Sequence, residues 1–304
     1  MKPASFTYHR ARDIAGAVGL LAELGEDAKV IAGGQSLVAM MNFRLARPAH
    51  LVDLGRLRRE LAYIRPEAGG ALRIGALTTH HEVETAELGP GFEVIRDAMR
   101  WIGHLPIRTR GTVGGSIAHA DATAEWCLLA VLLDAEIVVQ GPGGRRVVPA
   151  GDLFLGFYTT TLRPAEIIVE VVFPRAARRA ALVEFAERHG DFAVVAAAVD
   201  LDHGRVALGG VAPAPVRVPE AEAVLAGGRS AEVFAECAAA AAAAFDPPGD
   251  ADGNTGGNTG GDTGGDTGGD ADGDADGDAD GDAEYRRVLT RTLVIRACEE
   301  AMRR

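Results

Sequence analysis

Cysteine is scarce in this chain of 304 residues. The three cysteines, Cys127, Cys237 and Cys298, lie far apart in the sequence. Zinc sites and iron–sulfur clusters need several cysteines at short, fixed spacings, and a disulfide framework needs an even set. The sequence therefore predicts buried thiols, with no metal site and no disulfide framework in this chain.

Long apolar runs and basic clusters are also missing. The stretch at residues 127–133 is among the longest apolar runs, far short of the roughly 20 residues that a membrane-spanning helix requires. The first residues lack the apolar segment of a secretory signal, so we expect a cytoplasmic protein. Lysine occurs only as Lys2 and Lys29, and no basic stripe indicates nucleic-acid binding.

The net charge of −12 arises almost entirely from one low-complexity segment. Residues 250–281 are eight tetrads of the forms DADG, NTGG and DTGG, and residues 250–282 contain 11 aspartates without any lysine or arginine. Such a composition cannot bury apolar area, so we predict a disordered insert spanning residues 246–283. Residues 272–277 match only the first half of a calcium-binding loop, because Ala283 occupies the position of its final glutamate.

Two glycine-rich turns are the most informative feature that is present. They have the sequences AGGQSL at residues 32–37 and GTVGGS at residues 111–116. Glycine lets the backbone approach a ligand that a Cβ would block, so a β-branched residue at Gly114 is expected to displace such a ligand. Successive amides in such turns form an anion-binding concavity. Two of them predict a ligand with a diphosphate, although neither has the spacing of a dinucleotide-fold or P-loop motif.

The periodicity of apolar residues predicts two α+β domains. In the first, residues 1–176, we expect two lobes at about 1–55 and 56–176. Helices are expected at 13–24, after Thr79, and from a cap at Asp121 or Thr123 to Leu133; strands are expected at 29–32, 50–53, 72–76, 135–139, 146–148 and 167–173. In the second, residues 177–304, we expect strands at 181–187, 193–201 and 205–211, a helix from Ser230 to about 245 and a final helix at 284–303. This domain reads as an antiparallel sheet with helices on one face.

Linked motifs along the chain resemble one known family. They comprise VIAGGQSL at 30–37, RLARP at 44–48, LVDL at 51–54, IGALTTH at 74–80, IRTRGTVGGSIAHAD at 107–121, GDFA at 190–193 and AEYRR at 283–287. Together they resemble the FAD-binding medium subunit of the molybdenum hydroxylases, the group of carbon-monoxide dehydrogenase and xanthine dehydrogenase. The resemblance covers nearly the whole chain except the tetrad repeat.

The resemblance implies a fold and a cofactor site. The fold is a two-lobed FAD-binding domain of the PCMH or vanillyl-alcohol-oxidase type, followed by a carbon-monoxide-dehydrogenase flavoprotein C-terminal domain. The cofactor is noncovalent FAD, with its diphosphate on the two turns, Asp121 near the ribityl or adenosine part, and Arg188 and Phe192 near the flavin ring. The implied binding residues are Ala32, Gly33, Gly34, Gln35, Ser36, Leu37, Thr112, Val113, Gly114, Gly115, Ser116, Asp121, Ile168, Arg188 and Phe192.

The resemblance also implies a function without any catalytic acid or base in this chain. Electrons would pass from a molybdopterin-binding large subunit through a small [2Fe–2S] subunit to FAD and then to an external acceptor, in a dimer of heterotrimers. Phe192 departs from the family, which usually has a tyrosine at this position. Two other functions remain open from the sequence: a self-contained FAD-dependent oxidase of the same domain type, and a flavin-free scaffold subunit.

Overall fold

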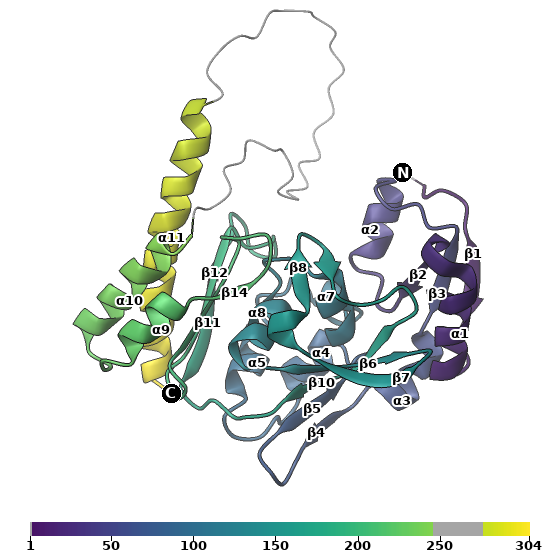
Figure 1. Ribbon diagram of the computed structural model, residues 1–304, viewed down its shortest axis with the longest axis horizontal. Helices are drawn as coiled ribbons and strands as arrows, with labels where there is room; N and C mark the ends of the chain where they lie inside the picture. Colours follow the sequence, from purple (N-terminus) through teal and green to yellow (C-terminus); the bar gives the residue numbers. More distant parts are fainter. Residues whose placement is uncertain (1, 246–275) are drawn as a thin grey trace, which may run out of the picture.

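The computed structural model describes residues 2–245 and 276–304 of the chain (Figure 1). An N-terminal lobe, a central lobe and a C-terminal helix–sheet unit follow one another along the sequence. The predicted α+β class with two successive domains is confirmed.

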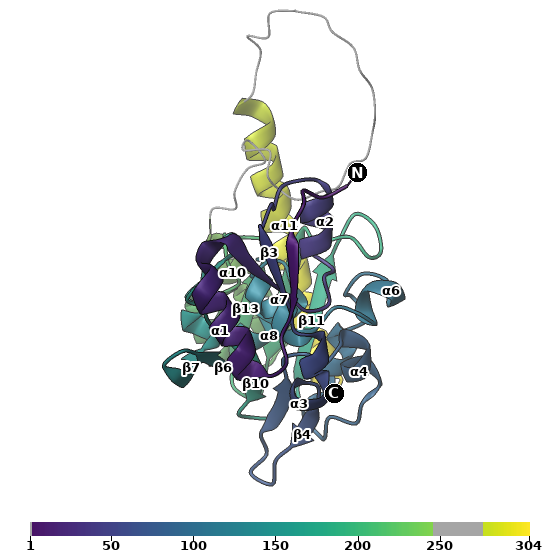
Figure 2. The same ribbon diagram turned by 90° about the vertical axis from the view of Figure 1, so that its right-hand side faces the viewer.

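The N-terminal lobe is a small parallel sheet with the strand order β1-β3-β2. Its elements are β1 (Thr7–Arg10), α1 (Ile14–Leu24), η1 (Gly25–Asp27), β2 (Ala28–Ile31), α2 (Leu37–Asn42) and β3 (His50–Asp53). The Asp13 side chain caps α1 by accepting from the Gly16 amide at 2.7 Å. Figure 2 is viewed from the side of this lobe, with α7 and α8 behind it.

The central lobe is built on a five-stranded antiparallel sheet with the order β4-β5-β10-β6-β7. Helix α8 (Glu125–Leu132) is buried over nearly its whole length and forms the main core with the sheet. The other strands and helices of this lobe are η2 (Gly55–Leu57), α3 (Arg58–Leu61), β4 (Ile64–Pro66), β5 (Leu72–Gly75), α4 (His80–Thr85), α5 (Glu93–Ala98), α6 (Leu105–Arg108), α7 (Val113–His119), β6 (Glu136–Gly141), β7 (Gly144–Pro149), η3 (Ala150–Asp152), β8 (Phe154–Gly156), β9 (Thr159–Thr160) and β10 (Ile167–Phe173).

The C-terminal unit is an antiparallel sheet with the order β11-β12-β13-β14. Helices α9, α10 and α11 cover one face, and α5 and α8 of the central lobe lie against the other (Figure 1). The bounds are β11 (Ala180–Phe185), β12 (Val195–Asp200), β13 (Arg205–Gly209), β14 (Val216–Arg217), α9 (Pro219–Leu225), α10 (Ala231–Ala243) and α11 (Asp276–Met302). The predicted sheet with helices on one face is confirmed, and its second face is buried as well.

Helix α11 begins earlier than the sequence predicts. It starts at Asp276, inside the tetrad repeat, rather than at Glu284. Negative charge is favoured in the first turns of a helix, which partly offsets the poor helix propensity of the glycines there. The prediction of disorder for residues 246–275 lies outside the described residues.

The predicted helix caps have mixed outcomes. Thr79 caps α4 in a reciprocal capping box with Glu82, and Ser230 caps α10 by accepting from the Val233 amide. The expected cap of α8 by Asp121 or Thr123 is wrong. The Asp121 carboxylate instead accepts hydrogen bonds from the amide and hydroxyl of Thr123 in a tight turn, and α8 begins at Glu125 after an uncapped Ala124.

Candidate functional site

The two glycine turns meet at one small pocket. The first turn follows β2, and the second leads into α7, which comes from the other lobe. The pocket has a volume of about 60 Å³ and is lined by Ala32, Gly33, Gly55, Arg58, Leu77, Arg110 and Thr112. Folding therefore brings together two motifs that lie almost 80 positions apart in the sequence.

Direct backbone packing holds the two turns together. A Cβ on Gly33 would lie 2.7 Å from the carbonyl carbon of Arg110 and 2.9 Å from the Cα of Gly111. A Cβ on Gly115 would be 4.0 Å from the Cβ of Ala32. Glycine is required at position 33 because the backbone of the other turn occupies the space of its side chain.

The first turn presents unpaired backbone amides. Within the described residues, none of the N–H groups of residues 33–36 donates a hydrogen bond to a protein acceptor. Gly34 has a φ of +73°, in the left-handed region, and the Gln35 side chain donates back to the Gly33 carbonyl at 3.1 Å. Leu37 then begins α2. This run of free donors fits an anionic ligand.

The second turn differs, and the prediction that it also offers bare amides is wrong. The Val113 amide donates to the Thr78 carbonyl at 3.0 Å, and the Gly114 amide donates to the Ala76 carbonyl at 2.9 Å. The Gly115 amide donates to the Thr112 side chain at 3.2 Å, and the Ser116 amide donates to the Thr112 carbonyl at 3.0 Å. These donors are used because the turn is also the start of α7, which docks on the chain after β5.

Gly114 serves packing within the protein. Its Cβ would lie 2.6 Å from the Cβ of Ala76, and the residue is buried. The sequence predicts that a β-branched residue at Gly114 displaces the ligand; in the structure its added atoms would meet Ala76, next to β5, first.

Two arginines complete the pocket and were not singled out from the sequence. Arg58 donates to the Leu77 carbonyl at 2.8 Å and to the Glu82 carboxylate at 2.7 Å. Arg110 immediately precedes the second turn and lines the same pocket. The sequence could have indicated Arg110 as a pocket residue, because it directly precedes the second glycine motif. It could not have indicated Arg58, because Arg58 reaches the pocket only through the packing of α3. Both arginines line the same pocket as Gly33, and Arg58 is also paired with Glu82 there.

Asp121 and Ile168 lie deeper in the central lobe. Asp121 is buried, and one of its oxygens accepts from both the amide and the hydroxyl of Thr123, at 2.9 and 2.8 Å. Ile168 on β10 is 5% exposed and belongs to the main hydrophobic core. No contact in the described chain brings either side chain into the pocket between the turns.

Arg188 and Phe192 lie on an exposed loop between β11 and β12. Phe192 is 62% exposed. The loop rests on the segment before α6, since a Cβ on Gly190 would lie 2.7 Å from the ring of His104, and the rings of His104 and His189 are 5.8 Å apart. The Phe192 side chain is thus exposed and does not line the pocket between the turns.

A buried histidine, His80, packs against the start of the second turn. The indole N–H of Trp126 donates to Nδ1 of His80 at 2.9 Å, and the His80 amide donates to the Gly111 carbonyl at 3.1 Å. Burial, together with the charge of Arg108, lowers the pKa of His80 to about 4. His80 is therefore neutral at physiological pH. Its ring accepts the hydrogen bond from Trp126, and its backbone amide holds the turn by donating to Gly111.

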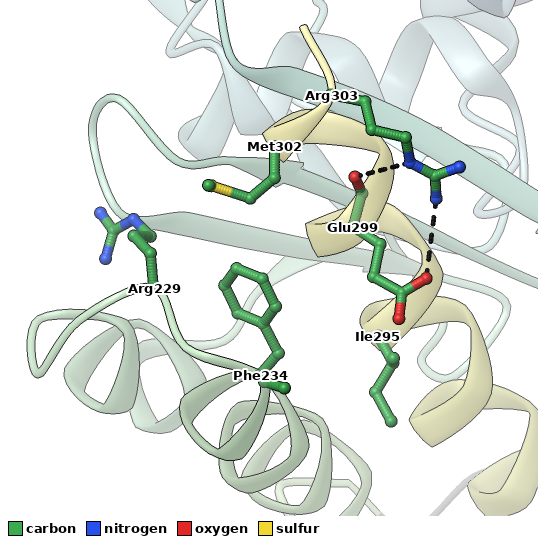
Figure 3. A pocket seen from close by; sticks show the side chains of 7 residues that line it. Arg229, Phe234, Ile295, Glu299, Met302 and Arg303 are labelled. Carbon is green, nitrogen blue, oxygen red and sulfur yellow. Dashed lines mark hydrogen bonds and ion pairs between the residues drawn. The ribbon is translucent and has the colours of Figure 1, made fainter.

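A larger groove of about 550 Å³ lies elsewhere, between α10 and the end of α11 (Figure 3). Phe234, Ile295 and Met302 point into it, and Arg303 pairs with Glu299 at its rim, 3.6 Å between charged atoms. None of the predicted site residues lines this groove. Its size alone does not make it the functional site.

The three cysteines lie in the interior of the protein, as the sequence predicts. Cys127, Cys237 and Cys298 are buried free thiols. In the part of the chain that the structure describes, no three metal-ligating side chains come together. In the same residues, no helix has both the length and the apolar character needed to cross a membrane.

Comparison with known proteins identifies the family. Residues 4–176 match the model for the FAD binding domain in molybdopterin dehydrogenase, and residues 180–256 match the model for the CO dehydrogenase flavoprotein C-terminal domain. The chain belongs to this family of FAD-binding subunits. It is an oxidoreductase subunit, and its predicted resemblance to the medium subunits of the molybdenum hydroxylases is confirmed.

Several relatives of this FAD-binding subunit are described. It is 42% identical to the 6-hydroxypseudooxynicotine dehydrogenase complex subunit alpha of Paenarthrobacter nicotinovorans, over 74% of this chain and 79% of that protein. It is 37% identical to the carbon monoxide dehydrogenase medium chain of Hydrogenophaga pseudoflava, over 71% of this chain and 78% of that protein.

Solved structures of the family have the same fold. Carbon monoxide dehydrogenase from Hydrogenophaga pseudoflava superposes with a TM-score of 0.83 at 33% identity, covering 100% of this chain and 99% of that one. Quinoline 2-oxidoreductase from Pseudomonas putida gives a TM-score of 0.81 at 30% identity, covering 99% and 100%. FAD is the cofactor of this domain, and molybdopterin and iron–sulfur groups belong to other subunits of such complexes.

Proposed function

We propose that this chain is the electron-transferring flavoprotein subunit of a heterotrimeric molybdenum hydroxylase. Its partners would be a large molybdopterin-binding subunit and a small [2Fe–2S] subunit, in a dimer of heterotrimers in the cytoplasm. The observation that carries the proposal is the convergence of the two glycine turns on one pocket, with unpaired amides at residues 33–36 and two arginines beside them.

The residues at this pocket fit the diphosphate of noncovalently bound FAD. The free amides of the first turn can donate to phosphate oxygens, and Arg58 and Arg110 supply positive charge. The hydroxyl of Ser36 is a further donor, since it makes no capping bond to α2. Phe192 would cover one face of the flavin ring, with Arg188 nearby, and Asp121 has one carboxylate oxygen not engaged by Thr123.

Bound FAD supplies the redox chemistry of the subunit, and the protein supplies binding and orientation. Among the described residues, no side-chain set is arranged as a nucleophile with its base, and His80 is held neutral by burial. This supports a role in which electrons pass through the cofactor and no side chain of this chain acts as an acid or base.

Measuring flavin content tests the proposal. We expect one FAD per chain, released into the supernatant on acid precipitation, and Arg110→Gln is expected to weaken FAD binding about tenfold through the loss of one charged contact. Arg59→Gln is the matched control, because Arg59 is an exposed arginine on the same short helix as Arg58 and lies outside the pocket. Equal affinity in both variants contradicts the placement of the diphosphate.

The subunit role has a separate test. The purified chain alone is expected to be reduced by dithionite and reoxidised by an artificial acceptor, but to show no substrate oxidation until both partner subunits are added. Substrate turnover by the single chain would favour the self-contained oxidase. A purified chain without flavin that still assembles with the partners would favour the scaffold.

A further inference from the structure

Two residues with left-handed backbones are hydrogen-bonded to each other at the end of α7. Ala120, the residue after α7, has a φ of +55°, and Tyr158, in the turn between β8 and β9, has a φ of +52°. The Tyr158 amide donates to the Ala120 carbonyl at 3.3 Å. A bulky residue rarely adopts such a backbone. Strained positions of this kind are concentrated at ligand sites, where the surrounding structure holds them in place.

The side chain of Tyr158 is held as well as its backbone. Its ring lies against the ring of His119, with the centroids 4.9 Å apart and the planes inclined by 33°. The Tyr158 side chain is nevertheless 45% exposed, so much of its surface is left for another group to cover. Burial lowers the pKa of His119 against the opposing charge of Asp121, and burial followed by the charge of Asp121 raises the pKa of Tyr158. Both rings are therefore uncharged near neutral pH.

Helix α7 connects this aromatic pair to the pocket between the glycine turns. The helix begins at the second turn, where the Thr112 side chain caps it. Gly115, Ala118 and His119 are spaced to share one face of the helix, and all three are at least partly exposed. The helical rise from Gly115 to His119 is about 6 Å. An accessible face of α7 thus leads from the diphosphate pocket to His119 and Tyr158.

The base of the Phe192 loop lies at the same end of α7. A Cβ on Gly210 would lie 3.1 Å from the carbonyl carbon of Val194, which follows Phe192 by two residues. The same Cβ would lie 3.4 Å from the Cγ2 atom of Thr123, which bonds to Asp121 in the turn after α7. Two segments that carry exposed aromatic side chains therefore adjoin the Asp121 turn.

We propose that the Tyr158 ring is a wall of the site for the flavin ring of FAD, and that His119 is a positioning residue that holds Tyr158 in place. This proposal rests on the proposed function, since it names a further residue at the same cofactor. An exposed ring that is already fixed by its backbone and by a neighbouring ring loses little entropy when a planar group packs against it. Such a ring fits an extended ligand whose diphosphate lies at the other end of α7.

Replacing Tyr158 by glycine in the full-length protein tests the wall. Glycine keeps the amide that bonds to Ala120 and accepts the positive φ, so relief of backbone strain offsets the lost ring contact. In Tyr158→Gly we expect a melting temperature close to that of the wild type, an FAD dissociation constant about tenfold higher and a shifted visible absorption band of the bound flavin. Tyr158→Phe keeps the ring and is expected to keep wild-type affinity. A purely structural residue would instead change the melting temperature and leave the flavin spectrum unaltered.

A double-mutant cycle tests the role of His119. If His119 acts through Tyr158, His119→Ala weakens FAD binding in the wild-type protein but not in Tyr158→Gly. Equal losses in the two backgrounds contradict the positioning role. Tyr158→Asn repeats the test of the wall with a side chain in place, because asparagine also tolerates a positive φ.

The matched control is Arg44→Gly. Arg44 is another exposed residue with a left-handed backbone, at a φ of +61°, and it does not line the pocket between the turns. This variant is expected to keep the wild-type FAD affinity and flavin spectrum.

The outcomes separate this proposal from the proposed function. A Tyr158→Gly protein with wild-type affinity and spectrum overturns the wall, and so does a defect confined to assembly with partner subunits. Weaker binding with an unaltered flavin spectrum would place the adenine ring on Tyr158 and overturn the assignment to the flavin ring. A wild-type chain that takes up no FAD contradicts both proposals.

Discussion

At the scale of the residue, Gly114 shows how a glycine within a motif can serve the packing of the protein interior. We expect Gly114→Ala to lower the free energy of unfolding by about 1–3 kcal/mol, because its methyl group would lie 2.6 Å from the Cβ of Ala76 in a packed region. Chemical denaturation measures the change. FAD binding is expected to weaken only together with stability.

The control for this substitution is Gly19→Ala. Gly19 is also a helical glycine, but a Cβ there would meet no atom within 4 Å. That substitution is expected to leave stability unchanged or to raise it by up to about 1 kcal/mol through better helix propensity. Unaltered stability in Gly114→Ala, with loss of FAD alone, would restore the interpretation that this glycine makes room for the ligand.

The sequence predicted where the glycine turns are but not what each glycine does. Motif spacing is local, so residues 32–37 and 111–116 could be identified from the chain alone. Which amides stay free depends on which carbonyls fold against them, and the partners of Val113 and Gly114 are Thr78 and Ala76, more than 30 positions away in the sequence. Such contacts leave no local signal.

At the scale of the element, the bond from Trp126 to His80 ties α8 to the start of α4. We expect Trp126→Phe to lower the free energy of unfolding by about 2–4 kcal/mol. The change leaves the buried Nδ1 of His80 without a donor, which costs about 1–3 kcal/mol, and also removes packed ring atoms. Thermal or chemical unfolding measures the loss.

The other tryptophan provides the comparison. Trp101 is half-buried, and its indole N–H has no acceptor in the described part of the chain. Trp101→Phe removes a similar number of ring atoms without leaving a buried acceptor unpaired. It is expected to be the milder of the two variants, and an equal loss in both would mean that the hydrogen bond contributes little.

Elements with a clear local pattern were predicted well, and their ends less well. The strands β10 and β12 follow from short continuous apolar runs, and the cap at Thr79 follows from hydrogen bonds within a few residues. The start of α11 was missed because aspartate and glycine favour loops on average, whereas a long helix already packed at its C-terminal end can extend through them. The start of α8 was missed because Asp121 bonds to Thr123.

At the scale of the whole molecule, two buried groups give opposite dependences of stability on pH. The pKa of His80 is about 4 in the folded state and 6.5 when unperturbed, so the unfolded chain binds more protons between these values and stability rises with pH. The pKa of Glu184 is about 7 instead of 4.5, so the folded chain binds more protons there and stability falls as pH rises.

Between about pH 4.5 and 6.5 the contributions of His80 and Glu184 to stability therefore have opposite signs. Glu184→Gln removes the contribution of Glu184, which lowers stability as pH rises, and leaves the contribution of His80, which raises stability as pH rises. Relative to the wild type, the melting temperature of this variant is therefore expected to rise with pH across the window. Melting curves at several pH values measure the difference, and parallel profiles for the two proteins would contradict it.

The tetrad repeat offers a second test at this scale. Deleting residues 250–275 removes acidic and small residues that have almost no apolar area to bury. We expect unchanged FAD content and a free energy of unfolding within about 1 kcal/mol of the full chain, since loop length has only a weak effect on stability. A larger loss would show that the repeat stabilises the body of the protein.

The fold of the whole chain could be predicted from its linked motifs, whereas side-chain contacts between elements far apart in the sequence could not. The fold class and the FAD-binding role follow from the family resemblance. The approach of Arg58 to the glycine turns depends on how α3 packs, and no spacing in the sequence encodes it. Sites built from several elements become visible only when the elements are assembled.

The backbone contact between Gly33 and the Arg110–Gly111 peptide also bears on the order in which the holoprotein is made. Because protein packs against protein at this point, the shape of the cradle is set during folding of the chain. The conformational entropy lost in bringing the two turns together is lost on folding and not on cofactor binding, so FAD would bind to a preorganised site. We therefore expect the chain to fold with the two turns already in contact and to bind FAD afterwards, at a preformed site.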